Sequence, residues 1–259
     1  MRLERLKLLR ERWQRWPWWV QFLMFTACSA GAVVSGGVFA LVPLTFGMLW
    51  LTGWSADSLG LRISQRRLLD FAGGAALGTA MVLAVILPFE LMTEVHWQRN
   101  QQVTTGLWMG GLWFYLKSSI FEELVFRGYG FLRLIEAIGF GWAQAVIALL
   151  FAVYHTVNVG MPLVPALLFT GLGSLLFGYA FRRSCGVMLP IGVHGAWNFW
   201  QEQLTGSSGR GQPGIWHMVL PAAGRLSFGF TYGALLLVTA GAAVAIRYWW
   251  RRKCAMEPI

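Results

Sequence analysis

The stretch "SSIFEELVFRG" (residues 118–128) places three ionisable side chains, Glu122, Glu123 and Arg127, in otherwise apolar sequence. On either side, the chain has the composition of a membrane-spanning helix. An ionised side chain at the centre of a bilayer costs at least ~2.5–3.5 kcal/mol, so such residues are candidates for function by default. The surrounding fold must therefore supply partners for these charges.

The rest of the sequence is that of a multi-pass membrane protein. Of its 259 residues, 56% are hydrophobic and 12% are charged, which is about half of the charged fraction of soluble domains. The apolar residues form runs long enough to span a bilayer. The net charge of +10 is concentrated in clusters at the ends of these runs, as in cytoplasmic loops that contact anionic lipids. We therefore expect membrane lipids, and no nucleic acid, as partners. The basic clusters are 2–15, 62–67, 182–183 and 247–253.

We predict an all-α polytopic membrane bundle of about eight transmembrane helices, with both termini cytoplasmic. Residues 1–16 are expected to form an amphipathic interfacial helix, residues 17–250 the transmembrane domain, and residues 251–259 a cytoplasmic tail. Eight spans place every basic cluster on one side, whereas seven would not. The predicted spans are 18–34, 37–53, about 68–91, one that starts near Gly106, and roughly 140–158, 163–181, 187–204 and 227–247, with polar loops at 92–105 and 205–226.

Helical geometry separates the two glutamates. Glu123 and Arg127 are four residues apart, so they share a helix face and can pair. Glu122 lies about 100° round the helix from Glu123 and has no basic residue three or four positions further on. Glu122 therefore needs a partner on another helix.

Three further polar residues lie in other predicted spans. His155 ends "LLFAVYH" (149–155), while His194 and Asn198 share a face within "HGAWN" (194–198). We expect them to meet Glu122 in one cavity. A desolvated glutamate can act as a general base on water, a neighbouring histidine can share that water or bind a metal, and a His–Asn pair can stabilise an oxyanion. Alternatively, Glu122, His155 and His194 ligate Zn²⁺.

Three known classes of intramembrane protease do not match the sequence. The chain has no pair of aspartates within its spans and no H-E-x-x-H motif. "GSSG" (206–209) has the serine pattern of rhomboid-like proteases, but it lies in a polar Gly/Ser loop and the last span has no histidine. Glu202 is expected to reach the outer membrane surface rather than the cavity.

The motifs "FEELVFRG" (121–128), "FAVYH" (151–155) and "HGAWN" (194–198), in this order, resemble the CAAX protease and bacteriocin-processing family of intramembrane endopeptidases, also called the Abi or Rce1-like family. The resemblance covers residues 106–204 and implies a protease core there. It implies that Glu122 and His155 activate the nucleophilic water and that His194 and Asn198 stabilise the oxyanion. Glu123 and Arg127 would support them. The resemblance leaves open whether the enzyme is a metalloprotease or a metal-free glutamate-dependent one.

We therefore expect an endopeptidase that cleaves a membrane-associated peptide or lipidated peptide. Prenylated CaaX tails and small signal or bacteriocin peptides are the candidate substrates. The expected location is a prokaryotic plasma membrane, which favours peptide processing or self-immunity. Two alternatives are a non-catalytic scaffold or regulator that acts through residues 1–16, and a proton-coupled transporter that uses the same Glu and His residues.

Overall fold

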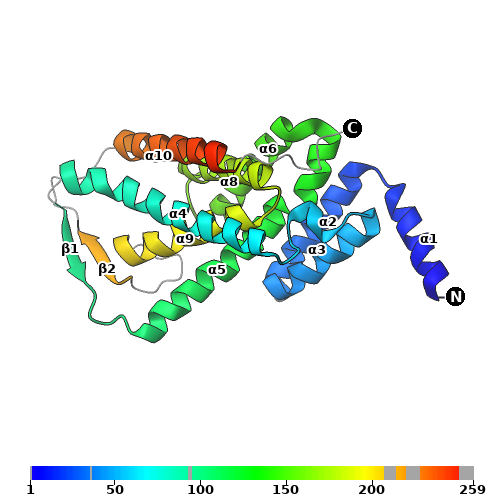
Figure 1. The fold of residues 1–259 in the computed structure, drawn as a ribbon, viewed down its shortest axis with the longest axis horizontal. Helices are drawn as coiled ribbons and strands as arrows, with labels where there is room; N and C mark the ends of the chain where they lie inside the picture. The colour runs from blue at the N-terminus through cyan, green and yellow to red at the C-terminus, as the bar shows by residue number, and fades with distance from the viewer. Residues whose placement is uncertain (1, 36, 93–94, 207–213, 220–227, 251–259) are drawn as a thin grey trace.

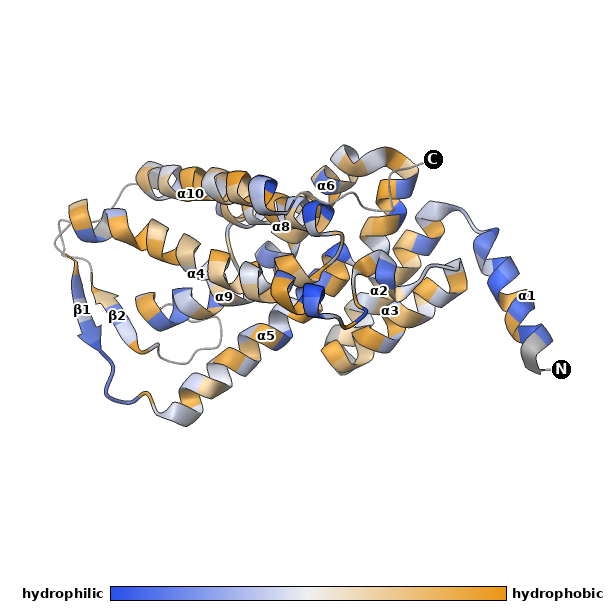
Figure 2. Cartoon of the chain, viewed as in Figure 1, coloured by the Kyte–Doolittle hydropathy of each residue, from blue (hydrophilic) through white to orange (hydrophobic). Residues whose placement is uncertain are grey.

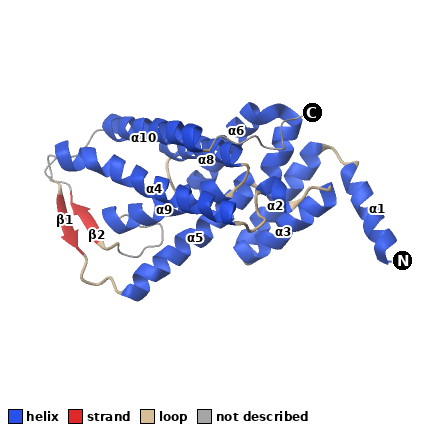
Figure 3. Ribbon diagram, viewed as in Figure 1, coloured by secondary structure: helices blue, strands red, loops and turns tan. Residues whose placement is uncertain are grey.

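The structure of the protein, a computed structural model, describes residues 2–35, 37–92, 95–206, 214–219 and 228–250. Helices make up nearly all of it (Figure 3). The helices are α1 (Arg2–Gln14), α2 (Trp18–Ser35), α3 (Val38–Thr52), η1 (Ala56–Leu59), α4 (Gln65–Met92), α5 (Thr105–Arg127), α6 (Tyr129–Val159), α7 (Leu163–Pro165), the π-helical turn η2 (Ala166–Thr170), α8 (Gly171–Ser184), α9 (Met188–Thr205) and α10 (Phe228–Trp249).

The chain has the helices of a multi-pass membrane protein. A helix lies on each of the eight predicted segments. Within the described residues, four helical stretches are long and apolar enough to cross a membrane, and α3 is a shorter apolar helix. Figure 2 shows apolar residues along α4 and α10, whereas α1 and the strand β1 are mainly hydrophilic. The four stretches are Gln65–Met92, Thr105–Val159, Leu163–Ser184 and Gly229–Trp249.

Two segments that were predicted to be loops pair as strands. β1 (His96–Arg99) and β2 (Trp216–Val219) form an antiparallel ribbon in which His96 faces Val219 and Arg99 faces Trp216. Each segment comes after the end of a helix. Their pairing gives the backbone N–H and C=O groups of both segments hydrogen-bond partners. The ribbon lies at the end of the molecule opposite α1 (Figure 1).

A bend joins the helix of the opening motif to the next one. After Arg127 the chain turns at Gly128 and continues as α6, which has a second break at Gly139, where φ is +77°. Residues 129–138, which lie between the opening motif and the predicted span at 140–158, are also helical. The ring pairs Phe131–Phe140 and Phe126–Phe151 show that the chain folds back at Gly139. This brings "FAVYH" to the depth of "FEELVFRG".

Glycines allow α4 and α9 to pack with their backbones in contact. A Cβ atom at Gly74 would collide with the carbonyl oxygen of Leu189, and one at Gly78 with that of Val193. A Cβ at Gly192 would collide with the carbonyl oxygen of Phe71. Small residues at membrane helix contacts permit such approach. The close packing fixes α9, which carries His194, against the bundle.

Three of the four basic clusters, 62–67, 182–183 and 247–253, lie near one another in the fold. Arg67 donates hydrogen bonds of 2.8 Å to the carbonyl oxygens of Ser184 and Cys185, after the Arg182–Arg183 pair. Arg183 donates to the carbonyl oxygens of Arg247 and Trp250, at 3.0 and 2.9 Å. The starts and ends of α4, α8 and α10 that carry these arginines therefore meet, as expected of loops on one side of a membrane.

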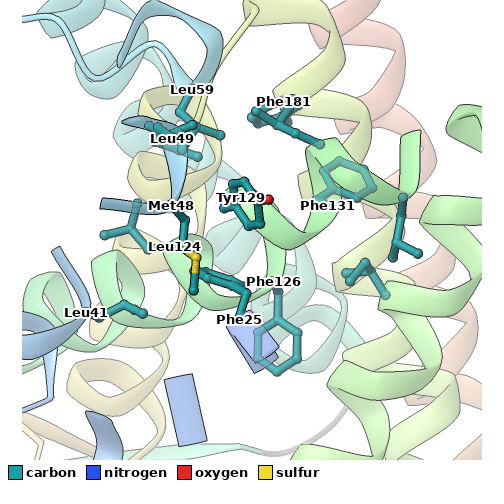
Figure 4. Packing of buried hydrophobic residues seen from close by; sticks show 14 of the residues in the cluster. Phe25, Leu41, Met48, Leu49, Leu59, Leu124, Phe126, Tyr129, Phe131 and Phe181 are labelled. Carbon is teal, nitrogen blue, oxygen red and sulfur yellow. The ribbon is translucent and has the colours of Figure 1, made fainter. Parts of the chain in front are cut away.

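A polar network joins the N-terminal helices to the start of α6. The Tyr129 hydroxyl donates to Gln21 Oε1 at 2.7 Å and lies 2.9 Å from the Thr52 hydroxyl. Trp13 Nε1 donates to Thr52 at 3.3 Å, and Gln21 Nε2 donates to the carbonyl oxygens of Trp13 and Trp16. Tyr129 is fully buried among Phe25, Met48 and other core residues (Figure 4). These contacts dock α1 and α2 onto the bundle.

Candidate active site

His194 lies between the two glutamates of the opening motif. Its Nδ1 is 2.9 Å from Glu123 Oε1, and its Nε2 is 3.7 Å from Glu122 Oε2. All three residues are buried. Ser118, one turn earlier on α5, donates a hydrogen bond of 3.2 Å to Glu122 Oε1. The glutamate without a cation on its own helix thus meets a histidine from α9.

Glu123 and Arg127 form the ion pair that their spacing predicts. Arg127 Nη1 lies 3.2 Å from Glu123 Oε1, and both side chains are fully buried. Arg127 Nη2 donates to the Ser174 carbonyl oxygen at 3.0 Å and also to the Ser174 hydroxyl. The guanidinium carbon is 4.9 Å from the centre of the Phe151 ring, within the range of a cation–π contact. Arg127 is thus held by residues of α6 and α8.

Gln144 of α6 forms hydrogen bonds with α8 at Ser174, the residue that also contacts Arg127. Its side-chain amide donates to the carbonyl oxygens of Ser174 and Leu175, at 3.3 and 2.6 Å. Gly178 leaves room for this side chain, because a Cβ atom there would collide with it. The position of Ser174, and through it that of Arg127, therefore depends on α6.

The orientation of the His194 ring is set from two sides. Phe177 of α8 stacks on it with a centroid distance of 4.6 Å and an interplanar angle of 20°. Because a carboxylate oxygen accepts hydrogen bonds, the contact with Glu123 places a hydrogen on Nδ1. Nε2, the nitrogen next to Glu122, is then available to interact with a ligand.

His155 borders this cluster. Its Nδ1 is 2.9 Å from the Phe151 carbonyl oxygen, which again assigns the hydrogen to Nδ1 and leaves Nε2 available. Its ring contacts that of Phe151, with a centroid distance of 4.5 Å, and the Phe151 ring is 6.0 Å from that of His194. His155 also lies within electrostatic range of Glu122 and His194.

Asn198 and Glu202 continue along α9 from His194. Asn198 is one turn further on and partly buried. Glu202 is fully buried, so the prediction that it reaches the outer surface is wrong. Its carboxylate accepts hydrogen bonds of 2.8 Å from the Tyr115 hydroxyl and 2.9 Å from Gln203 Nε2. These donors compensate the burial of the carboxylate.

Unpaired polar atoms are concentrated at this site. Among the described residues, buried atoms without a hydrogen-bond partner include Glu122 Oε2, Glu123 Oε2 and Arg127 Nε. Two nearby buried atoms also lack a hydrogen-bond partner. They are Ser119 Oγ, which precedes the glutamates on α5, and Gln144 Oε1, which belongs to the side chain that bonds to the backbone of Ser174 and Leu175. A buried polar group without a partner requires an explanation, and catalysis is one such explanation.

The side chains do not form a ready-made metal site. Over the described residues, no group of three or more His, Cys, Asp or Glu side chains is placed to hold a metal ion. Glu122 and His194 approach each other, but no third ligand completes the set. In the described part of the chain, Glu122, His155 and His194 are therefore not gathered into a three-ligand group, and zinc binding by these residues stays a prediction.

Sequence reasoning missed the residues that hold the cluster in place. Ser174 and Phe177 have ordinary membrane-helix identities, and no sequence pattern distinguishes them from packing residues. Gln144 carried a signal, because it is a polar side chain inside a predicted span. Ser118, four residues before Glu122, could have been found from helical spacing alone.

Comparison with protein families identifies a relationship for the segment that carries the site. Residues 104–200 match the family described as Rce1-like, the type II CAAX prenyl endopeptidases. The matched segment contains all three motifs. No curated protein shows significant similarity to the chain.

Proposed function

Since residues 104–200 belong to the Rce1-like family of type II CAAX prenyl endopeptidases, we propose that the chain is an intramembrane endopeptidase that cleaves a membrane-associated peptide. Its nucleophile is a water molecule activated by Glu122 and His155. His194 and Asn198 stabilise the oxyanion, and Glu123 and Arg127 position His194. CaaX-type tails and signal- or bacteriocin-like peptides are the two substrate classes to test.

The contact of His194 with both glutamates carries this proposal. Glu122, Glu123 and Arg127 together have one more negative charge than positive charge when all are ionised. One proton on His194 makes the cluster neutral, and a neutral cluster is less costly to bury than a charged one. Nε2 of the protonated ring is then a hydrogen-bond donor beside Glu122 Oε2, 3.7 Å away.

The reaction follows from these positions. Glu122 accepts a proton from water while the water oxygen bonds to the carbonyl carbon of the substrate. The oxyanion that forms accepts hydrogen bonds from His194 Nε2 and the Asn198 side-chain amide. When the C–N bond breaks, the proton on Glu122 passes to the amine nitrogen. Water has then been divided between the two products, and Glu122 returns to its starting state.

The membrane arrangement is part of the proposal. The eight helical segments would cross a prokaryotic plasma membrane with both termini in the cytoplasm. The meeting of the arginine-bearing ends of α4, α8 and α10 supports this orientation. The α1 helix would lie on the cytoplasmic surface, where its arginines contact anionic lipids.

The direct test is cleavage by the purified protein in lipid vesicles. A prenylated CaaX-type peptide and a signal-type peptide are supplied separately, and the products are identified by mass spectrometry. Glu122→Gln and His194→Ala should each abolish cleavage. Glu136→Gln is the matched control, because Glu136 is an exposed carboxylate on α6 paired with Arg133. Cleavage that survives both site variants would rule out this mechanism.

Two further experiments distinguish a metal-free protease from a metalloprotease and from a scaffold. Dialysis against a chelator should leave the cleavage rate unchanged, because the mechanism uses side chains alone. Loss of activity that zinc restores would show that the ligand set rearranges around a metal. If the protein acts as a scaffold, deletion of residues 1–16 should abolish its cellular effect while Glu122→Gln preserves it.

A further inference from the structure

An apolar groove lies between α3, α4, α5 and α9, outside the cluster around His194. It has a volume of about 370 Å³. As far as the structure describes its lining, the side chains are apolar apart from Thr45, whose hydroxyl donates a hydrogen bond of 2.9 Å to the Leu41 carbonyl oxygen. Phe46 and Leu68 of the lining are exposed. In a membrane the groove therefore opens toward lipid and offers van der Waals contacts to a hydrocarbon chain.

The groove runs from the basic cluster at 62–67 into the membrane. Leu61 and Leu68, which directly flank this cluster in sequence, both line the groove. On α5 the lining residues are Leu116, Ile120 and Leu124, spaced four residues apart, and they cover about 12 Å of the helix axis. A chain that enters beside the basic cluster can therefore lie along α5 in the hydrocarbon part of the bilayer.

Two arginines of the cluster can reach a ligand at the mouth of the groove. Arg67 is fixed by its hydrogen bonds to the turn between α8 and α9. Arg66 is exposed, and within the described part of the chain no hydrogen bond or ion pair involves its side chain. Arg62 is also exposed and lies 3.8 Å from the exposed Asp57. Such a pair between solvated side chains contributes little, so an anion can compete with Asp57 for Arg62.

The loop between these arginines has the character of a membrane contact. Ile63, next to Arg62, is 88% exposed. An exposed apolar side chain beside arginines is typical of segments that lie in the headgroup region of a bilayer. The loop thus combines positive charge at headgroup level with an apolar groove directly below it.

The groove and the proposed catalytic carboxylate are on opposite faces of α5. Ile120 and Leu124 are each two residues from Glu122, which places Glu122 about 160° round the helix from them. A peptide held at Glu122 would have to pass round α5 to place a chain in the groove. The occupant is therefore a separate molecule, and the membrane supplies one with the required chemistry.

We propose that the groove binds an anionic phospholipid. One acyl chain lies along Leu116, Ile120 and Leu124, and the phosphate contacts Arg62 and Arg66. Basic pockets between membrane helices on the cytoplasmic side bind anionic headgroups in this way. The lipid would connect α3, α4, α5 and α9. This site goes beyond the proposed endopeptidase function and does not depend on it.

The test uses phosphatidylglycerol that carries a photoreactive group on one acyl chain. The full-length protein is irradiated in phosphatidylcholine vesicles that contain increasing amounts of this probe, and the labelled residues are identified by mass spectrometry. Labelling should concentrate on groove residues of α3 and α5, and a phosphatidylcholine probe should label them much less. Each cation near an anionic lipid surface contributes about five-fold in affinity. Arg62→Gln/Arg66→Gln should therefore raise the half-saturating amount of phosphatidylglycerol about 25-fold.

A matched double variant shows whether the effect is local. Arg5→Gln/Arg12→Gln removes the same charge from exposed positions of α1, at one end of the molecule (Figure 1), and should leave groove labelling unchanged. Leu68→Trp places a larger side chain at the mouth and should reduce labelling by both probes. If Leu68→Trp does not fold, the two arginine variants still decide the question.

Four results would overturn the proposal. The first two are equal labelling of the groove by the two probes and an equal loss in the α1 variant, which would show general attraction to the membrane surface. The third is displacement of the lipid by a prenylated peptide, which would assign the groove to a substrate. The fourth is a chain-to-chain cross-link formed by a photoreactive residue in place of Leu68, which would assign the groove to a second copy of the protein.

Discussion

Two buried polar groups lie only two residues apart along the chain, and they differ in one respect. Around Tyr129, the side chains of Gln21, Thr52 and Trp13 are joined by hydrogen bonds, and none of these four has an unpaired buried atom. Around Arg127, in contrast, Glu122, Glu123 and Arg127 each leave a buried atom without a partner. Both groups connect several helices.

The difference in unpaired buried atoms indicates which of the two groups is structural and which is functional. A fully satisfied network holds helices together and offers nothing to a ligand. Buried carboxylate and guanidinium atoms without a hydrogen-bond partner destabilise the folded state. A water or substrate that binds to them removes this penalty. The Tyr129 group is therefore structural, and the Arg127 group is prepared for a reaction.

The largest effect is expected for Glu122→Gln. Loss of a general base typically lowers the rate by about 10²–10⁴-fold. Stability should be unchanged or slightly higher, because a neutral amide replaces a buried carboxylate. Cleavage in vesicles and unfolding in detergent measure the two quantities. A large loss of stability would instead place Glu122 with the structural group.

Arg127→Leu should have the largest effect on stability. Removal of one partner from a buried ion pair typically destabilises a protein by about 3–5 kcal/mol, because the other charge stays buried and unpaired. Here that charge is Glu123. The double variant Arg127→Leu/Glu123→Met should be more stable than Arg127→Leu alone and equally inactive. If the double variant is the less stable of the two, charge burial is not the cause.

Tyr129→Phe should affect stability without affecting the reaction. The substitution leaves Gln21 Oε1 buried without its donor, which costs about 1–3 kcal/mol. Since Tyr129 has no contact with His194 or Glu122, kcat/KM per folded molecule should stay the same. A selective fall in kcat would show that the two groups are coupled through Gly128.

Ser174→Ala should give the smallest effect, roughly a tenfold loss in kcat, as expected for one hydrogen bond to a charged group. KM should not change, because Ser174 acts on Arg127 and not on the substrate. Ser29→Ala is the matched control, because Ser29 Oγ is buried and has no partner. Equal effects of the two substitutions would contradict a positioning role for Ser174.

The sequence by itself determined the helices, the pairing of Glu123 with Arg127, and the similarity of residues 104–200 to the Rce1-like family. Apolar runs and i,i+4 spacing are local properties, so they can be read along the chain. It did not determine the β1–β2 ribbon, whose strands are far apart in sequence and pair through backbone groups. It also placed Glu202 at the surface, because the Tyr115 hydroxyl that compensates its burial comes from another helix.

Only the tertiary structure decided that His194 meets both glutamates, and which of its nitrogens faces each of them. The turns at Gly128 and Gly139 bring residues 151–155 back beside Phe126, and Ser174, Gln144 and Phe177 then orient Arg127 and His194. These are contacts between helices, and many packings of the same helices would satisfy the same apolar pattern. The chemistry of the site depends on the one packing in which its charges meet.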